Sequence, residues 1–410
     1  MMLEVKMKKR LNLLAMFSVL LLAVTAGCAR MAARCDSPED NPKHHYLQGM
    51  TLLEKGKIDD ANAKFDRAVY CDERFGPGYA GQAIVSALKA KDQKEGYRKV
   101  DIDKANEKLK LASKKASTKE DEFQYYVASI RVNTTLKPKD WLDGAQDDYK
   151  SAMKLKVDEN RLIYYDGREA ASYFMGIAYL EGRAFQQARD RFSDVLSAYH
   201  REGKWHESAD KGWKRVDKIV RAMSGITVGD VGKEIALKDS IKRGDMVALL
   251  VDELKIDKLF AGRIPVKSQV DKMKAEFTPA DVVSHQFKEE ILTAMKWGVR
   301  GLEPVYDETT KAYLFKPDDT VTRKEMALVL EDVLIKLAGD EKIATAFFGQ
   351  EKSPFPDVPA SSAWYNAAMN MTTRNIMEAE LSGEFRPNDK VDGPEALLAI
   401  RVLRQRLNIY

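Results

Sequence analysis

The sequence predicts an all-α protein in two parts: a solenoid of helical hairpins over residues 44–202 and a helical bundle over residues 205–410. Between residues 44 and 202 the chain is rich in Ala, Leu, Lys, Asp and Glu and contains only two prolines, Pro77 and Pro138. From about residue 205 onward, Gly, Pro and Asp interrupt shorter helical patterns. Two differently built domains also fit the length of the chain, which exceeds the usual limit for one hydrophobic core.

A three-residue pattern recurs four times in the first part. In each copy an Ala is followed four residues later by a large residue, and seven residues later by a small or β-branched one. This spacing puts all three on one helix face, where the small residues let a neighbouring helix approach closely. We therefore expect three or four helical hairpins, with longer connections at residues 91–101 and 134–140. The copies are Ala61/Phe65/Ala68, Ala105/Leu109/Ala112, Ala145/Tyr149/Ala152 and Ala188/Phe192/Val195.

Two of the copies are preceded by matching residues on a partner helix. Gly49 and Leu52 precede the first copy, and Gly176 and Tyr179 precede the last copy at the same offsets. The pattern resembles the tetratricopeptide repeat (TPR), although the separations of 44, 40 and 43 residues between copies exceed the regular spacing of about 34 residues. The resemblance implies a TPR-like stacked array whose concave surface binds peptides or proteins, with most of the periodic residues in the core.

A turn followed by a capped helix is the clearest pattern in the second part. Pro317 and Asp318 predict the turn. Thr322 is then placed as the N-cap of a helix, and Glu325 completes a capping box before an apolar run. Arg323 falls in the first turn of this helix, where backbone N–H groups and a guanidinium together suit an anionic group.

This segment resembles the end of the S-layer homology (SLH) motif, and similar elements occur in the same order three times. The position of the arginine is taken by Arg243 in the first copy, Arg323 in the second and Gly393 in the third. The resemblance implies an SLH domain in which three motifs pack as a pseudo-threefold helical bundle. The motifs span about 205–255, 278–338 and 353–410.

In this family the grooves of the bundle bind cell-envelope polysaccharide, often through a negatively charged pyruvyl group. The resemblance therefore implies that Arg243 and Arg323 contact the anion. It also suggests that Trp364 and Trp297 stack on sugar rings, the alternative being that both tryptophans belong to the core. Because Gly393 replaces the third arginine, we expect one or two competent grooves.

An apolar segment near the start of the chain predicts export. Basic residues precede the apolar run at 11–24, which is shorter than a membrane-spanning helix and ends in small residues. The letters VTAGC, which end at Cys28, resemble the lipobox of bacterial lipoproteins. The resemblance implies removal of residues 1–27, a covalent lipid on Cys28 and a lipidated linker over residues 28–43; the alternative is an ordinary secretory signal. Ala29, in place of an aspartate, resembles the outer-membrane sorting choice of Gram-negative lipoproteins.

The two remaining cysteines, Cys35 and Cys71, form an even pair in a chain expected to be exported. Cys35 lies just before the first predicted hairpin, and Cys71 lies at the end of its second helix. Antiparallel packing brings these two ends together. We therefore expect a disulfide, the alternative being two isolated thiols.

Charge and motif content argue against other classes of function. Residues 1–27 account for a net charge of +3 out of the total of +4, and the rest of the chain has no basic stripe of the kind that binds nucleic acid. His44 and His45 are adjacent, so they are not spaced as two ligands on one helix face, and Cys-x-x-Cys, HExxH and phosphate-loop patterns are absent from the sequence. We expect no catalytic residues, no metal and no cofactor other than the covalent lipid, and no nucleic-acid partner.

These features together predict a lipid-anchored tether in the cell envelope, in the outer membrane of a Gram-negative bacterium. The lipid would bind the membrane, the second part would bind envelope polysaccharide, and the repeat surface would bind an unidentified protein. The alternative is an assembly or secretion factor whose second part docks proteins and has no glycan function.

Overall fold

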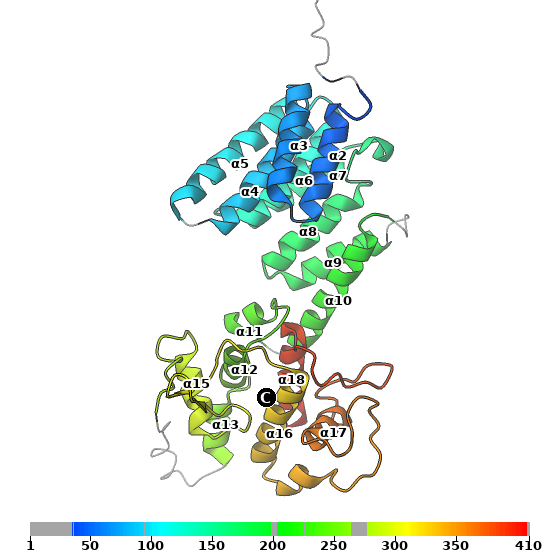
Figure 1. The fold of residues 1–410 in the computed structure, drawn as a ribbon. Helices are drawn as coiled ribbons and strands as arrows, with labels where there is room; N and C mark the ends of the chain where they lie inside the picture. The colour runs from blue at the N-terminus through cyan, green and yellow to red at the C-terminus, as the bar shows by residue number, and fades with distance from the viewer. Residues whose placement is uncertain are drawn as a thin grey trace, which may run out of the picture. The chain divides into compact units, whose positions relative to one another are not determined.

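The computed structural model describes residue 35 and residues 37–93, 95–197, 203–224, 227–263 and 277–407. The described residues are mostly helical, as predicted. The chain divides into two compact units (Figure 1). Unit 1 comprises Met1–Gly182 and Asp194–Glu207, and unit 2 comprises Arg183–Ser193 and Ser208–Tyr410. This division differs from the predicted boundary near residue 202 by assigning residues 183–193 to the second unit. Cys28 lies outside the described residues.

Unit 1 is built from consecutive helices that pack in pairs. Helix α2 contacts α3, α4 contacts α5, and α6 contacts α7, while α6 also contacts both α4 and α8. A short 3-10 helix, η2 (Glu159–Arg161), lies in the connection between α7 and α8. The α-helices of this part are α2 (Pro42–Glu54), α3 (Ile58–Cys71), α4 (Gly76–Asp92), α5 (Glu95–Lys115), α6 (Lys119–Leu136), α7 (Trp141–Lys154), α8 (Glu169–Glu181) and α9 (Phe185–Ser197), of which α9 crosses the division between the units.

Phe65 explains why small residues recur in this array. Its ring is fully buried. A Cβ atom added at Gly49 of α2 would lie 2.5 Å from the ring, and one added at Gly81 of α4 would lie 2.4 Å from it. Helices α2 and α4 therefore reach Phe65 because both lack a side chain at the point of contact. Phe192 has a similar neighbour in unit 2, where a Cβ at Gly212 would lie 2.8 Å from its ring.

The expected long connection at residues 91–101 is wrong. Helix α4 ends at Asp92 and α5 begins at Glu95. Residues 96–100 are exposed and helical. Residues 91–101 are mostly polar, but Arg and Lys are good helix formers, so a polar composition alone does not make a loop.

The described part of unit 2 contains shorter helices and one β-hairpin. The first part of α9 and most of α10 belong to this unit, and α18 is the last helix described in it. The elements are α10 (His206–Met223), α11 (Asp230–Ile235), α12 (Arg243–Ala248), the π-helical turn η3 (Leu249–Glu253), α13 (Ile256–Arg263), α15 (Lys288–Lys296), strands β1 (Val305–Asp307) and β2 (Ala312–Leu314), α16 (Arg323–Ala338), the 3-10 helix η4 (Glu341–Thr345), α17 (Tyr365–Thr373) and α18 (Gly393–Arg406).

Three extended segments of unit 2 form a closed cycle of backbone hydrogen bonds. The N–H of Ile241 donates to the carbonyl of Val391 at 2.9 Å, Val391 donates to Val321 at 3.1 Å, and Val321 donates to Ile241 at 3.0 Å. All three side chains are buried. Helices α12, α16 and α18 each begin two residues after one of these positions. The cycle therefore brings three helix N-termini around one centre.

Two aspartates hold equivalent turns in unit 2. The carboxylate of Asp281 accepts hydrogen bonds from the N–H of Phe315 and of the next residue, at 2.9 and 2.7 Å. The carboxylate of Asp357 accepts hydrogen bonds from the N–H of Phe385 at 2.9 Å and from the N–H of Arg386 at 2.6 Å. In both turns the residue after Phe has a φ of 57°. The two segments that precede α16 and α18 are thus built alike.

Candidate functional site

Arg243 holds the backbone of a neighbouring segment. It is the first residue of α12. Its Nε donates to the carbonyl of Phe315 at 3.0 Å, and its Nη1 donates to the carbonyl of Gly301 at 2.8 Å. Its Nη2 lies 3.4 Å from the carbonyl of Glu303. The guanidinium also lies 4.8 Å from the centroid of the Phe315 ring. All three of these hydrogen bonds are to the protein's own carbonyl groups.

Arg323 has the same role at the start of α16. Its Nε donates to the carbonyl of Phe385 at 2.7 Å, its Nη2 donates to the carbonyl of Glu378 at 2.7 Å, and its Nη1 pairs with the carboxylate of Glu395. The residue is only 2% exposed. Burial lowers its pKa to about 10, so the guanidinium stays charged at neutral pH. The expectation that Arg323 grips an anion directly is therefore corrected, because its donors already serve protein acceptors.

Gly393 has no room for an arginine. Its N–H donates to the carbonyl of Lys238 at 2.9 Å. A Cβ atom at this position would lie 1.8 Å from the carbonyl oxygen of Ile235. The third copy therefore lacks the arginine for a steric reason.

The two predicted sugar-stacking tryptophans lie in different environments. Trp297 is 5% exposed, donates from Nε1 to Asp257 at 2.8 Å and packs edge-on against Phe260 at 5.5 Å. The alternative that it is a core residue therefore holds, and the stacking expectation is corrected. Trp364 is partly exposed, with the ammonium of Lys324 5.0 Å from the ring centroid. Its indole Nε1 is buried and has no hydrogen-bond partner within the described ranges.

A cavity of about 650 Å³ lies beside Arg323. Its walls come from α10, from the segment 375–381 and from α18, all in unit 2. Five basic residues line it against three carboxylates, so its lining has an excess of positive charge. The basic residues are Lys218, Arg221, Arg323, Arg386 and Arg401, and the acidic residues are Glu378, Glu380 and Glu395.

Arg401 differs from the other basic residues of this cavity, which each have a carboxylate partner. Arg386 pairs with Glu380 at 2.9 Å, and Arg221 pairs with Asp217 at 3.0 Å. Arg401 has no carboxylate partner among the residues that the structure describes; its Nη1 donates to the carbonyl of Arg221. The Nε atoms of Arg401 and Arg386 are both buried and lack an acceptor there. Sequence analysis missed Arg401 because it lies late in the last helix, outside the segment that carries the family resemblance.

In unit 1 the chain covers part of its own helices with an aromatic cluster of Tyr164, Tyr165 and Trp205. All three residues are at most 5% exposed. The hydroxyl of Tyr164 donates to Glu54 of α2 at 2.6 Å, and Arg131 of α6 donates to the hydroxyl of Tyr165 at 3.4 Å. These bonds tie the cluster to helices α2 and α6.

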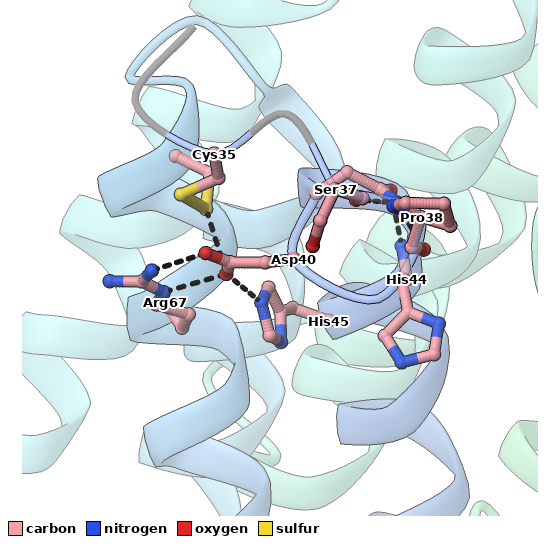
Figure 2. The surroundings of a disulfide bond; sticks show 9 residues. Cys35, Ser37, Pro38, Asp40, His44, His45 and Arg67 are labelled. Atoms are coloured by element: carbon pink, nitrogen blue, oxygen red, sulfur yellow. Dashed lines mark hydrogen bonds and ion pairs between the residues drawn. A yellow bond between two sulfur atoms is a disulfide. The ribbon is translucent and has the colours of Figure 1, made fainter.

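A disulfide joins Cys35 to Cys71 at the end of α3 (Figure 2). Beside it, the carboxylate of Asp40 accepts hydrogen bonds from Nε and Nη2 of Arg67 at 2.9 and 2.5 Å, and lies 2.7 Å from Nε2 of His45. The bonds from Arg67 and His45 lower the pKa of Asp40 to about 2. Asp40 and the two sulfurs lie within 4.8 Å of one another. Because both sulfurs are in the disulfide, they do not offer thiolate ligands to a metal.

Comparison with known proteins identifies one family. Residues 354–397 match the family model of the S-layer homology domain. Searches of curated proteins and of solved structures gave no match. The matched segment contains Trp364, Arg386 and the start of α18, and it lies within the third predicted motif. Within the described ranges, no helix is both long and apolar enough to cross a membrane. Residues 354–397 therefore carry an S-layer homology domain, which indicates attachment to the cell envelope, often to its polysaccharide.

Proposed function

We propose that this protein is a lipid-anchored tether that joins a membrane to the polysaccharide of the cell envelope. The S-layer homology domain at residues 354–397 supports the polysaccharide end of the tether. The lipobox-like segment that ends at Cys28 supports the membrane end. Ala29 favours the outer membrane of a Gram-negative bacterium as the location.

The polysaccharide end is a three-motif bundle. The observation that supports this arrangement best is the closed cycle of backbone hydrogen bonds through Ile241, Val321 and Val391. Arg243 and Arg323 reinforce it, since each spans from the start of one helix to the carbonyl groups of a neighbouring segment. These arginines position the walls of the binding surface and do not themselves grip the glycan.

The anionic part of the glycan binds in the cavity beside Arg323. The lining carries five basic and three acidic residues, and Arg401 is without an ion-pair partner among the residues that the structure describes. Acidic substituents of an envelope polysaccharide supply the missing counter-charge. An ionised acceptor would form charge-assisted hydrogen bonds with the guanidinium of Arg401, and such bonds are stronger than neutral ones.

Two-point attachment explains how modest glycan affinity suffices. Each buried CH₂ of an acyl chain contributes about 0.8 kcal/mol, so a multiply acylated Cys28 stays in the membrane. Once the lipid is in the membrane, unit 2 is held near the polysaccharide, and a high effective concentration governs its binding. Unit 2 can therefore rebind after each dissociation, so a single tight contact is not needed.

The repeat part of unit 1 presents a surface for a protein partner outside the aromatic cluster of Tyr164, Tyr165 and Trp205. The alternative function is an assembly or secretion factor, in which unit 2 docks proteins and has no glycan role.

Sedimentation with purified cell wall separates the two functions. The full chain is used with Cys28→Ser, so that membrane attachment through the lipid does not contribute. If the protein is a tether, it sediments with wall polysaccharide from which proteins have been removed. High salt then releases it, because the contact in the cavity is ionic. If it stays in the supernatant but binds envelope proteins, the assembly function replaces the tether. Mass spectrometry of the native protein tests the anchor, which requires an acylated Cys28 as the first residue.

A further inference from the structure

We propose that the β1–β2 hairpin of unit 2 presents an aromatic platform, formed by Tyr306, Tyr313 and Phe277, that binds the apolar face of a sugar ring. The proposal rests on the polysaccharide-binding function above and adds a second contact site to it, separate from the cavity beside Arg323. It names the recognised chemistry as the C–H-rich face of a pyranose within the envelope glycan.

The register of the hairpin puts the two tyrosines together. Tyr306 and Tyr313 are directly opposite each other in the antiparallel pair, and opposite residues lie on the same face of a sheet. Their ring centroids are 5.3 Å apart, and the ring of Phe277 lies 5.0 Å from that of Tyr313. The N–H of Ala280 donates to the carbonyl of Tyr313 at 3.1 Å, which ties the segment that carries Phe277 to the hairpin.

These three aromatic residues are exposed although they touch one another. The exposed fractions are 43% for Tyr306, 49% for Tyr313 and 39% for Phe277. Single exposed apolar residues are common on protein surfaces, but a contiguous group marks an interaction site more often. The three residues therefore form a candidate binding surface.

The hairpin is held rigidly without a ligand. At its turn, the carboxylate of Asp307 accepts hydrogen bonds from the N–H and hydroxyl of Thr310 at 3.0 and 2.7 Å. At its base, Arg243 donates to the carbonyl groups of Gly301 and Phe315, one on each side of the hairpin. A surface that is ordered in advance loses little entropy on binding. Arg243 thus positions the platform and is not its contact residue.

The hairpin is also an addition to the motif that contains it. From Gly298 to Arg323 the separation is 25 residues, whereas from Asn375 to Gly393, at the equivalent helix end and helix start, it is 18 residues. The shorter connection suffices to build the turn before α18. The extra residues of the longer connection account for most of the hairpin, which runs from Val305 to Leu314.

A sugar fits this platform better than a second copy of the chain. The exposed parts of three aromatic side chains amount to roughly 250 Å², on the basis of about 200 Å² for a whole ring. A stable protein interface needs about 800 Å² from each partner. The rings of Tyr306 and Tyr313 are inclined at 67° to each other, so a pyranose can lie on the face of one ring with the other ring at its edge. Its polarised C–H groups favour the negative face of an aromatic ring.

The test measures affinity for purified envelope polysaccharide by titration calorimetry, with the full chain carrying Cys28→Ser. The double variant Tyr306→Thr/Tyr313→Thr removes both rings and keeps residues that favour strands. Tyr97→Thr is the control, because Tyr97 is 77% exposed and lies on α5 of unit 1. We expect affinity to fall about tenfold or more in the double variant and to be unchanged in the control. Hydrogen exchange at the N–H of Ala280 verifies that the hairpin is still folded.

Three outcomes overturn the proposal, and they are distinguishable. If the parent protein binds glycan and the folded double variant binds equally well, the platform is wrong and the tether stands. If the parent protein does not bind glycan at all, the proposed function fails and the platform fails with it. If sedimentation velocity shows a dimer that the double variant loses, the occupant is a second copy and not a sugar.

Discussion

Replacing Gly393 by alanine is expected to destabilise unit 2, although alanine is usually the better helix residue. The added Cβ would lie 1.8 Å from the carbonyl oxygen of Ile235 and 2.7 Å from its carbonyl carbon. Non-bonded contacts of Cβ atoms below 3.0 Å are essentially never seen. The obstacle is backbone, so a side-chain rotation cannot relieve the clash, and one of the two segments must move by about 1 Å.

The magnitude follows from two losses and one gain. Overpacking of this kind costs about 1–3 kcal/mol. Movement apart also weakens the bond from the N–H of Gly393 to the carbonyl of Lys238, which is worth about 1 kcal/mol. The change from Gly to Ala in a helix returns about 0.5–1 kcal/mol. The net expectation is a loss of about 1–3 kcal/mol in the free energy of unfolding of unit 2.

Urea titration followed by hydrogen-exchange mass spectrometry measures this loss, because peptides of unit 2 are read separately from those of unit 1. Gly262→Ala is the matched control, since Gly262 lies in helix α13 and a Cβ there meets nothing within 4 Å. The control is expected to be neutral or slightly stabilising. Equal stability of the two variants would refute the close approach of residues 235–236 to α18.

Three further predictions concern buried or bonded groups. Arg323→Ala should lower the stability of unit 2 by about 3–5 kcal/mol in the same urea assay, because Glu395 loses its partner. If the variant is as stable as the parent protein and has lost only glycan binding, Arg323 contacts the glycan directly after all. The double replacement Cys35→Ser/Cys71→Ser should cost unit 1 about 2–4 kcal/mol, and the mature protein should show no free thiol at these positions; two titratable thiols contradict the disulfide. Asp40 has a folded-state pKa of about 2 against 3.8 in the reference state, so its stabilising contribution is present above pH 3.8 and is lost as the pH falls toward 2. Asp40→Asn should remove that dependence on pH, and an unchanged pH profile would contradict the pairing.

The packing of the repeats was accessible from the sequence because it depends on local periodicity. The alanine members of the first pattern, Ala61 and Ala68, are fully buried on either side of the buried Phe65. Asn375 follows α17 as Gly298 follows α15, and both residues have a left-handed backbone, with φ of 55° and 56°. Asn, like Gly, is a residue that adopts this backbone at a helix end.

What the sequence did not show was the direction in which long side chains point. A motif places Arg323 at a helix start, but only the tertiary structure shows that its guanidinium turns inward to the carbonyl groups of Phe385 and Glu378. Arg401 escaped notice for the converse reason, since nothing local distinguishes it from other basic residues on a helix. The hairpin that carries Tyr306 and Tyr313 was not predicted, because three residues per strand are too few for a clear alternating pattern.

We propose that unit 2 grips an acidic envelope polysaccharide in the cavity beside Arg323. The most direct test measures the dissociation constant for purified polysaccharide in the Cys28→Ser protein, with and without the added change Arg401→Ala. Arg98→Ala removes the same charge from an exposed position of α5 and is the control. We expect at least tenfold weaker binding for Arg401→Ala, corresponding to about 1.4 kcal/mol, and no change for Arg98→Ala. Equal affinities of the two variants, with both proteins folded, would contradict the proposal.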